Sequence, residues 1–143
     1  MVTILADEVL PVLARARALA AEMGSDCVGY EHLVVAVLDQ SNTATELLGV
    51  MGIDGLVLGE RVLAGMDRGR GLDPLAGKPY SVRFKALLSQ AIAEAERTGR
   101  AQPRCVELLL GALGVADGNC SAVFSDVGLT VDRVRSAIEG SAQ

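Results

Sequence analysis

Cys27 and His32 are the two neighbouring side chains whose types could support nucleophilic catalysis. A thiol five residues from an imidazole has the chemistry of a nucleophile and its general base. The sequence supplies no Asn or Asp pattern to orient the imidazole and no oxyanion element. We therefore expect no enzymatic activity, and we interpret Cys27, Cys105 and Cys120 as small apolar packing residues.

Metal and nucleotide chemistry are equally poorly supported. His32 is the single histidine, so a zinc site would need Cys and carboxylate ligands at spacings that the sequence does not supply. A phosphate-binding loop of the Gly-x4-Gly-Lys-Ser/Thr type does not occur either. We expect neither a metal nor a cofactor.

Composition and charge exclude two further classes of function. The 143 residues include 13 Lys and Arg against 18 Asp and Glu, a formal net charge of -5, which is unlike a nucleic-acid-binding protein. No apolar run approaches the roughly 20 residues that span a bilayer, and Asp7 and Glu8 stand where a signal peptide would be positive. The odd number of cysteines, without CxxC spacing, fits a reducing compartment. We expect a cytoplasmic protein that binds neither nucleic acid nor membranes.

An internal repeat sets the expected architecture. An apolar stripe at helical spacing ends at Gly24, and adding 75 to each residue number gives a second stripe that ends at Gly99. The apolar segments 33–38 and 108–113 correspond at the same offset, and the segments 51–53 and 127–129 correspond one residue out of step. Since half of the residues are hydrophobic but only four are aromatic, the core should be aliphatic and helical.

The predicted fold class is all-α, with eight helices in two four-helix repeats related by a pseudo-twofold axis. We expect one domain over 1–143, made of a first repeat at 1–66, a linker at 67–79 and a second repeat at 80–143. The linker is rich in Gly and Pro. The expected helices cover 4–23, 30–39, 43–51, 54–66, 80–98, 104–114, 119–127 and 130–140.

Capping residues support several of these helix starts. We expect Asp7 to cap near the start of the first helix, which would leave Pro11 in its first turn. Asn42 precedes a predicted Thr43-x-x-Glu46 capping box. The other predicted caps are Asp54, Ser81 and Thr130.

The segment Val28-Gly29-Tyr30-Glu31-His32-Leu33 and its apolar continuation resemble the Ile-Gly-Thr-Glu-His-Ile signature of the double Clp repeat. That repeat forms the N-terminal domain of Clp unfoldases of the ClpA and ClpC type. Met51-Gly52-Ile53, the opening 80–85 of the second repeat and the segment 131–135 are also similar to the family pattern. The resemblance extends over nearly the whole chain. It implies a receptor domain for substrates and adaptors rather than an ATPase.

Some ClpC-type relatives use the signature Glu of both repeats to bind phosphorylated arginine. The first repeat keeps this carboxylate as Glu31, between Tyr30 and His32, whereas the second repeat has Val106 at the equivalent position and Glu107 one residue later. The resemblance therefore implies one possible phosphoarginine-like site at Tyr30, Glu31 and His32. A structural interpretation competes with it, in which Glu31 is a first-turn carboxylate favoured by the helix dipole and His32 ties the loop to the neighbouring helix.

A second family surface receives cyclic-peptide antibiotics in actinobacterial ClpC proteins. The residues that match or nearly match it are Val12, Leu13, Pro79, Tyr80 and Lys85. Tyr80 would act there as a binding platform or, alternatively, as core filling.

Three functional hypotheses follow. The preferred one is a non-enzymatic, monomeric binding domain of Clp-dependent proteolysis, whose partners are protein substrates, adaptors or Clp unfoldase components. The second is a free-standing decoy that sequesters cyclic peptides, and the third is a purely structural helical module. The Met1 start, the tail 140–143 and the many departures from the ClpC pattern lead us to expect a free-standing protein rather than a fragment of an unfoldase.

Overall fold

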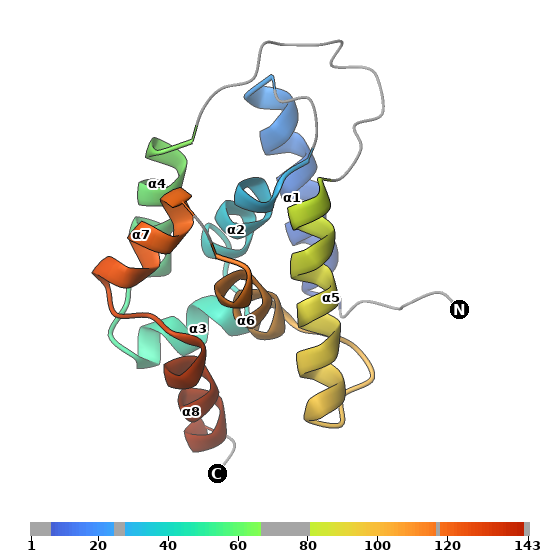
Figure 1. Cartoon of the computed structure of the whole chain (residues 1–143), viewed down its shortest axis with the longest axis vertical. Coiled ribbons are helices and arrows are strands. Elements are labelled where there is room, and N and C mark those ends of the chain that lie inside the picture. The colour runs from blue at the N-terminus through green and yellow to red at the C-terminus, as the bar shows by residue number, and fades with distance from the viewer. Residues whose placement is uncertain (1–6, 25–27, 67–80, 117, 142–143) are drawn as a thin grey trace.

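The protein is all-α in a computed structural model that describes residues 7–24, 28–66, 81–116 and 118–141. Eight helices occupy these residues (Figure 1): α1 (Val9–Glu22), α2 (Tyr30–Leu38), α3 (Thr43–Val50), α4 (Gly55–Ala64), α5 (Val82–Arg97), α6 (Cys105–Gly114), α7 (Gly118–Asp126) and α8 (Val131–Ser141). The described ranges contain no β-strand. The predicted fold class and the order of its helices are confirmed.

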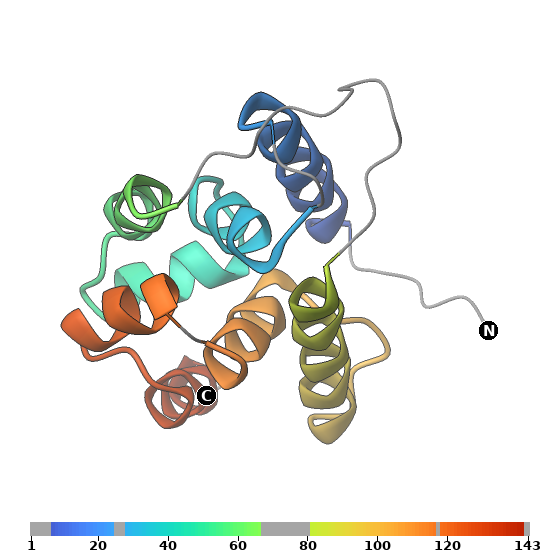
Figure 2. The same cartoon turned by 45° about the horizontal axis from the view of Figure 1, so that its top comes forward.

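The two central helices, α2 and α6, are repeat equivalents. The consecutive apolar residues 33–38 and 108–110 leave neither helix a polar face at these positions, and all of them are buried. Helix α1 packs on α2 as α5 packs on α6, and α4 packs on α2 as α8 packs on α6. Figure 2 shows α2 and α6 in the middle of the molecule, with the other helices around them.

Corresponding helices in the two halves are followed by glycines with the same backbone conformation. Gly24 and Gly99 follow α1 and α5 with φ of 65° and 77°, and Gly52 and Gly128 follow α3 and α7 with φ of 80° and 68°. These are left-handed conformations that glycine adopts without a steric penalty. The first pair is 75 residues apart and the second pair 76, as the sequence offset predicts. The proposed division into repeats and linker stays a prediction, because residues 67–80 lie outside the described part of the chain.

Most of the predicted caps are confirmed. Asp54, Ser81 and Thr130 accept hydrogen bonds from backbone N–H groups in the first turns of α4, α5 and α8. At α3 the capping box is displaced by one residue. Asn42 accepts from the N–H groups of Ala44 and Thr45, and the Thr45 hydroxyl accepts from the Asn42 N–H.

The start of α1 differs from the prediction. The helix begins at Val9 after Glu8, whose side chain does not cap it, so the expected capping by Asp7 is wrong. Pro11 does lie in the first turn, where its missing N–H costs no hydrogen bond. The Glu8 carboxylate is instead bound by other helices, as described below.

Among the described residues, no single helix is both long and apolar enough to cross a membrane. Helices α6 and α7 reach the length of a span only when they are taken together, and the pair is bent by 109°.

Candidate functional site

Tyr30 fastens the start of α2 to α6, and His32 caps the first turn of α2. The Tyr30 hydroxyl donates a 2.5 Å hydrogen bond to the Ala112 carbonyl on α6, and the Arg83 guanidinium lies 4.3 Å from the centre of its ring. Nδ1 of His32 accepts from the Gly29 N–H at 2.8 Å. Burial lowers the pKa of His32 and raises that of Tyr30. Both side chains are buried, and the bond from Gly29 to His32 closes the first turn of α2 itself.

Glu31 is the more accessible member of the signature. Its carboxylate accepts a 3.0 Å hydrogen bond from Nδ2 of Asn119, which also donates to the Val62 carbonyl at 2.8 Å. Asn119 thus joins the starts of α2 and α7 to α4. A guanidinium that paired with Glu31 would have to share its carboxylate with this amide.

The equivalent position in the second repeat is differently built. The Thr43 hydroxyl accepts from the Val106 N–H at 3.1 Å, so α3 meets the start of α6 where α7 meets the start of α2. Glu107 accepts from the N–H of Arg104 at 2.8 Å and from its guanidinium at 3.0 and 2.8 Å. Glu107 is buried and caps α6 as His32 caps α2. It therefore does not replace the carboxylate that Val106 lacks.

Glu8 connects both repeats at this place, a role that the sequence interpretation missed. Its carboxylate accepts hydrogen bonds from the Thr43 N–H at 3.0 Å, the Thr43 hydroxyl at 2.5 Å and the Cys105 N–H at 2.7 Å. Burial raises the pKa of Glu8, but the bonds from Thr43 and Cys105 outweigh it and the pKa is lowered. An anion is favoured here because the starts of α3 and α6 both present N–H groups.

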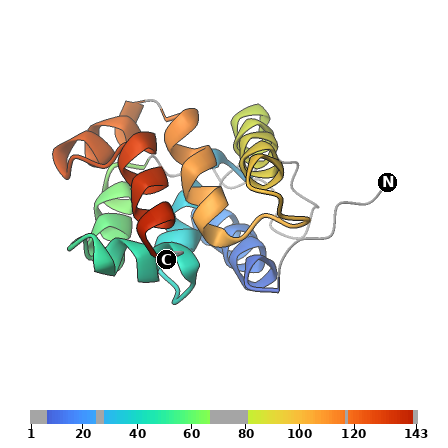
Figure 3. The same ribbon diagram turned by 90° about the horizontal axis from the view of Figure 1, so that it is seen from below.

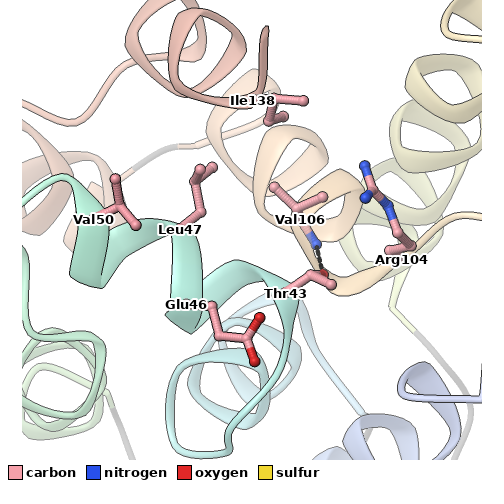
Figure 4. A pocket seen from close by; sticks show the side chains of 7 residues that line it. All are labelled: Thr43, Glu46, Leu47, Val50, Arg104, Val106 and Ile138. Carbon is pink, nitrogen blue, oxygen red and sulfur yellow. Dashed lines mark hydrogen bonds between the residues drawn. The ribbon is translucent and has the colours of Figure 1, made fainter. Parts of the chain in front are cut away.

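A groove of about 280 Å³ lies beside this junction, between α3, α6 and α8. Figure 3 shows the three helices from below, and Figure 4 shows the groove from close by. Leu47, Val50, Val106 and Ile138 form its apolar surface. Thr43, Glu46 and Arg104 complete the lining. Val50 is 78% exposed, although it is a large apolar residue.

The second surface predicted from the sequence is only partly described. Pro79 and Tyr80 lie outside the described residues, as does Cys27. Val12 is 1% exposed and belongs to the core, Leu13 is half-buried against it, and Lys85 is exposed on α5. Val82, at the start of the same helix, is 83% exposed.

The cysteines that the structure describes are unsuited to catalysis. Cys105 and Cys120 are fully buried free thiols. Burial raises the pKa of Cys105, and it raises that of Cys120 to about 12. The reactive thiolate is therefore disfavoured at both positions. No group of three or more His, Cys, Asp or Glu side chains within the described ranges is arranged to hold a metal ion.

The described helices form two similar four-helix units around the buried helices α2 and α6, and an apolar groove lies between the units. The protein is thus an all-α domain built from a repeated helical unit. Residues 5–101 match the family described as Clp repeat (R) N-terminal domain, and the chain belongs to that family. The family links the chain to Clp chaperone and protease systems.

One curated relative is the negative regulator of genetic competence ClpC/MecB of Bacillus subtilis (strain 168). It is 22% identical over 128 residues, which are 89% of this chain and 16% of the relative. The chain thus spans about one sixth of that protein.

Solved structures share the fold. The N-domain of ClpV from Vibrio cholerae has a TM-score of 0.75 at 19% identity, over 95% of this chain and 82% of that one. The N-terminal domain of ClpD from Arabidopsis thaliana has a TM-score of 0.71 at 16% identity, over 99% and 97%. The Hsp104 N-terminal domain from Candida albicans has a TM-score of 0.74 at 15% identity, over 93% and 87%.

Proposed function

We propose that the domain is a non-catalytic receptor that binds protein substrates or adaptors of a Clp chaperone or protease in the groove between α3, α6 and α8. The observation that carries the proposal is the exposure of Val50 at the rim of a groove whose surface continues through Leu47, Val106 and Ile138. An apolar segment laid into the groove would remove Val50 and the exposed part of Ile138 from water, which favours association at about 25 cal/mol per Å² of apolar area. Membership of the Clp repeat family supports the same function.

A binding assay with a matched pair of variants tests this function. A fluorescein-labelled, unfolded casein fragment is titrated with the wild type, Val50→Asp and Val82→Asp. We expect Val50→Asp to weaken binding about tenfold, because a carboxylate would be desolvated in the groove. Val82→Asp makes the same chemical change at an equally exposed site on α5 and should bind like the wild type. Equal affinity of all three proteins would place the binding surface elsewhere.

The cyclic-peptide decoy is the second candidate, and the exposure of Val82 three residues before Lys85 favours it. The variants Val50→Asp and Val82→Asp also test the decoy hypothesis, with their expected effects exchanged. A cyclic-peptide antibiotic that binds at the start of α5 should lose affinity for Val82→Asp and keep it for Val50→Asp. If neither ligand class binds the wild type, the purely structural module becomes the better hypothesis.

Phosphoarginine recognition receives little support from the geometry. Glu31 already accepts from Asn119, Val106 offers no carboxylate, and Glu107 is paired with Arg104. We expect calorimetry to give no heat with free phosphoarginine at millimolar concentration. A cytoplasmic, monomeric protein remains our expectation for the location and assembly state.

A further inference from the structure

A second pocket adjoins the groove on the far side of Arg104 and is rich in arginine. It has a volume of about 250 Å³ and lies between the end of α5, the buried helix α6 and α8. Its charged lining residues are Arg97, Arg100, Arg104, Arg135, Glu94, Glu107 and Glu139. Four of the seven cationic side chains between residues 80 and 143 therefore line one pocket, in a chain whose net charge is -5.

The two buried carboxylates of this pocket do not saturate its donors. Glu94 accepts from both Arg97, at 3.2 Å, and Arg135, while Glu107 accepts from Arg104 alone. Nε of Arg135 is buried without an acceptor. The exposed side chain of Arg100 makes no hydrogen bond or ion pair with the described part of the chain, although its backbone N–H donates to the Ala95 carbonyl. Glu139 offsets one of the surplus charges, which leaves the lining with a net charge of +1. The pocket thus has unused N–H donors and one surplus positive charge.

The repeat offset shows that the sign of the charge is reversed between the two equivalent sites. Gly29 and Glu31 at the start of α2 correspond to Arg104 and Val106 at the start of α6. The first site presents a carboxylate, whereas the second presents an apolar side chain and a guanidinium. A ligand chosen by the second site should therefore combine an apolar group with an anionic one.

We propose that the arginine pocket binds the carboxylates of an acidic stretch that adjoins the apolar anchor of a bound protein segment. Arg104 and Ile138 line both the groove and the pocket, so a segment in the groove can continue directly into the pocket. Guanidinium groups pair with carboxylates through two parallel N–H donors, and the exposed side chain of Arg100 has its donors available. This inference rests on the proposed function, and it adds a preference for segments in which acidic residues lie next to apolar ones.

Three labelled peptides test the preference. They share one apolar anchor, Leu-Val-Leu, and continue with Asp-Asp, Asn-Asn or Lys-Lys. We expect the Asp peptide to bind the wild type about tenfold more tightly than the Asn peptide at 50 mM NaCl, and the Lys peptide to bind least tightly. At 500 mM NaCl the difference should largely disappear, because salt screens partly exposed charge pairs.

Two charge-reversal variants separate the pocket from the net charge of the protein. Arg100→Glu should abolish the preference for Asp over Asn. Arg17→Glu makes the same change of charge on α1, which lies away from α8 in Figure 1, and should preserve the preference. Equal binding of the Asp and Asn peptides to the wild type, or an equal loss in both variants, would overturn the inference.

The outcomes also separate this inference from the function on which it rests. If the Asn peptide binds and Val50→Asp weakens it, but Asp gives no advantage, the groove stands and the arginine pocket is not a ligand site. If no peptide binds the wild type, both proposals fail.

Discussion

Glu8 shows how one side chain holds elements that are far apart in the sequence. Its carboxylate receives hydrogen bonds from Thr43 at the start of α3 and from Cys105 at the start of α6, which lies 97 residues along the chain. These N–H groups have no partner within their own helices. A charged acceptor shared by two helix starts is therefore a stabilising contact between the repeats.

Replacing Glu8 by Gln should reduce the stability of the fold. Gln keeps one acceptor oxygen but loses the charge, so we expect a cost of about 1–2 kcal/mol at pH 7 in urea unfolding. Because the pKa of Glu8 is lowered in the folded state, its contribution is present above the ordinary value of 4.5 and is lost as the pH falls through the folded pKa. The difference in stability between the wild type and Glu8→Gln should therefore shrink as the pH falls below 4.5.

Asp7→Asn provides the control for this measurement. It removes the same charge one residue earlier, at an exposed position that does not cap α1. We expect less than about 0.5 kcal/mol of change. A loss in Asp7→Asn as large as in Glu8→Gln would show that the hydrogen bonds of Glu8 are not the cause.

The buried thiols should be unreactive until the protein unfolds. In a Cys27→Ser background, Cys105 and Cys120 are the remaining thiols, and both are fully buried with raised pKa values. We expect almost no reaction with a disulfide reagent at pH 8 in buffer, and two equivalents in denaturant. Rapid labelling in buffer would contradict the packing role of these cysteines.

Side-chain roles were predicted from the sequence where they depend on nearby residues. The caps at Asp54, Ser81 and Thr130 are local in this sense. The roles of Glu8 and Arg104 were missed. Glu8 acts on residues 35 and 97 positions away, which a single sequence does not bring together. Arg104 and Glu107 have the spacing of a helical ion pair, which was an available signal.

At the scale of the elements, α5 and α6 pack closely at Gly111. Gly111 faces α5, and a Cβ atom at this position would lie 2.5 Å from the Leu87 carbonyl oxygen and 3.1 Å from the Ala91 nitrogen. Both contacts are with backbone, which does not move aside as a flexible side chain does. The small residue is therefore what allows the two helices to approach.

Two Gly→Ala substitutions with opposite outcomes test this packing. Gly111→Ala should destabilise the protein by about 1–3 kcal/mol, because overpacking outweighs the gain in helix propensity. Gly49→Ala is the matched control in α3, where the added Cβ meets nothing within 4 Å. It should stabilise the protein by about 0.5–1 kcal/mol. Stabilisation by both substitutions in thermal unfolding would contradict the close approach of α5 and α6.

The helices themselves were largely predictable, because α2 and α6 are short apolar runs between turn residues and the others carry apolar stripes. The exception is the start of α1, which was placed near residue 4 and lies at Val9. Apolar spacing alone extends a helix as far as the stripe continues. The observed start at Val9 puts Pro11 in the first turn, where a proline is tolerated.

At the scale of the whole molecule, the two halves share one core. Tyr30 on α2 bonds to Ala112 on α6, and α3 packs against α6. We expect a single cooperative unfolding transition, with coincident curves from far-UV circular dichroism and from tyrosine absorbance. A fragment of residues 1–66 should be largely unfolded, since it exposes the faces of α2 and α3 that α6 covers. Two separate transitions, or a folded fragment, would mean that the repeats are independent.

Charge is distributed unevenly between the two halves of the chain. Residues 1–66 carry 3 positive and 9 negative side chains, whereas residues 80–143 carry 7 of each. The excess of acidic groups is thus in the half with Glu31, and four arginines of the other half gather beside the groove. We infer that the domain presents two equivalent sites of opposite electrostatic character.

Mapping of backbone amide shifts by nuclear magnetic resonance tests the central claim most directly. The ¹⁵N-labelled domain is titrated with the Leu-Val-Leu-Asp-Asp peptide. We predict that the shifted resonances cluster at 43–50 in α3, at 104–110 in α6 and at 135–139 in α8. Shifts confined to the region of Glu31 and Asn119 or to the start of α5, or no shifts at saturating peptide, would contradict the account.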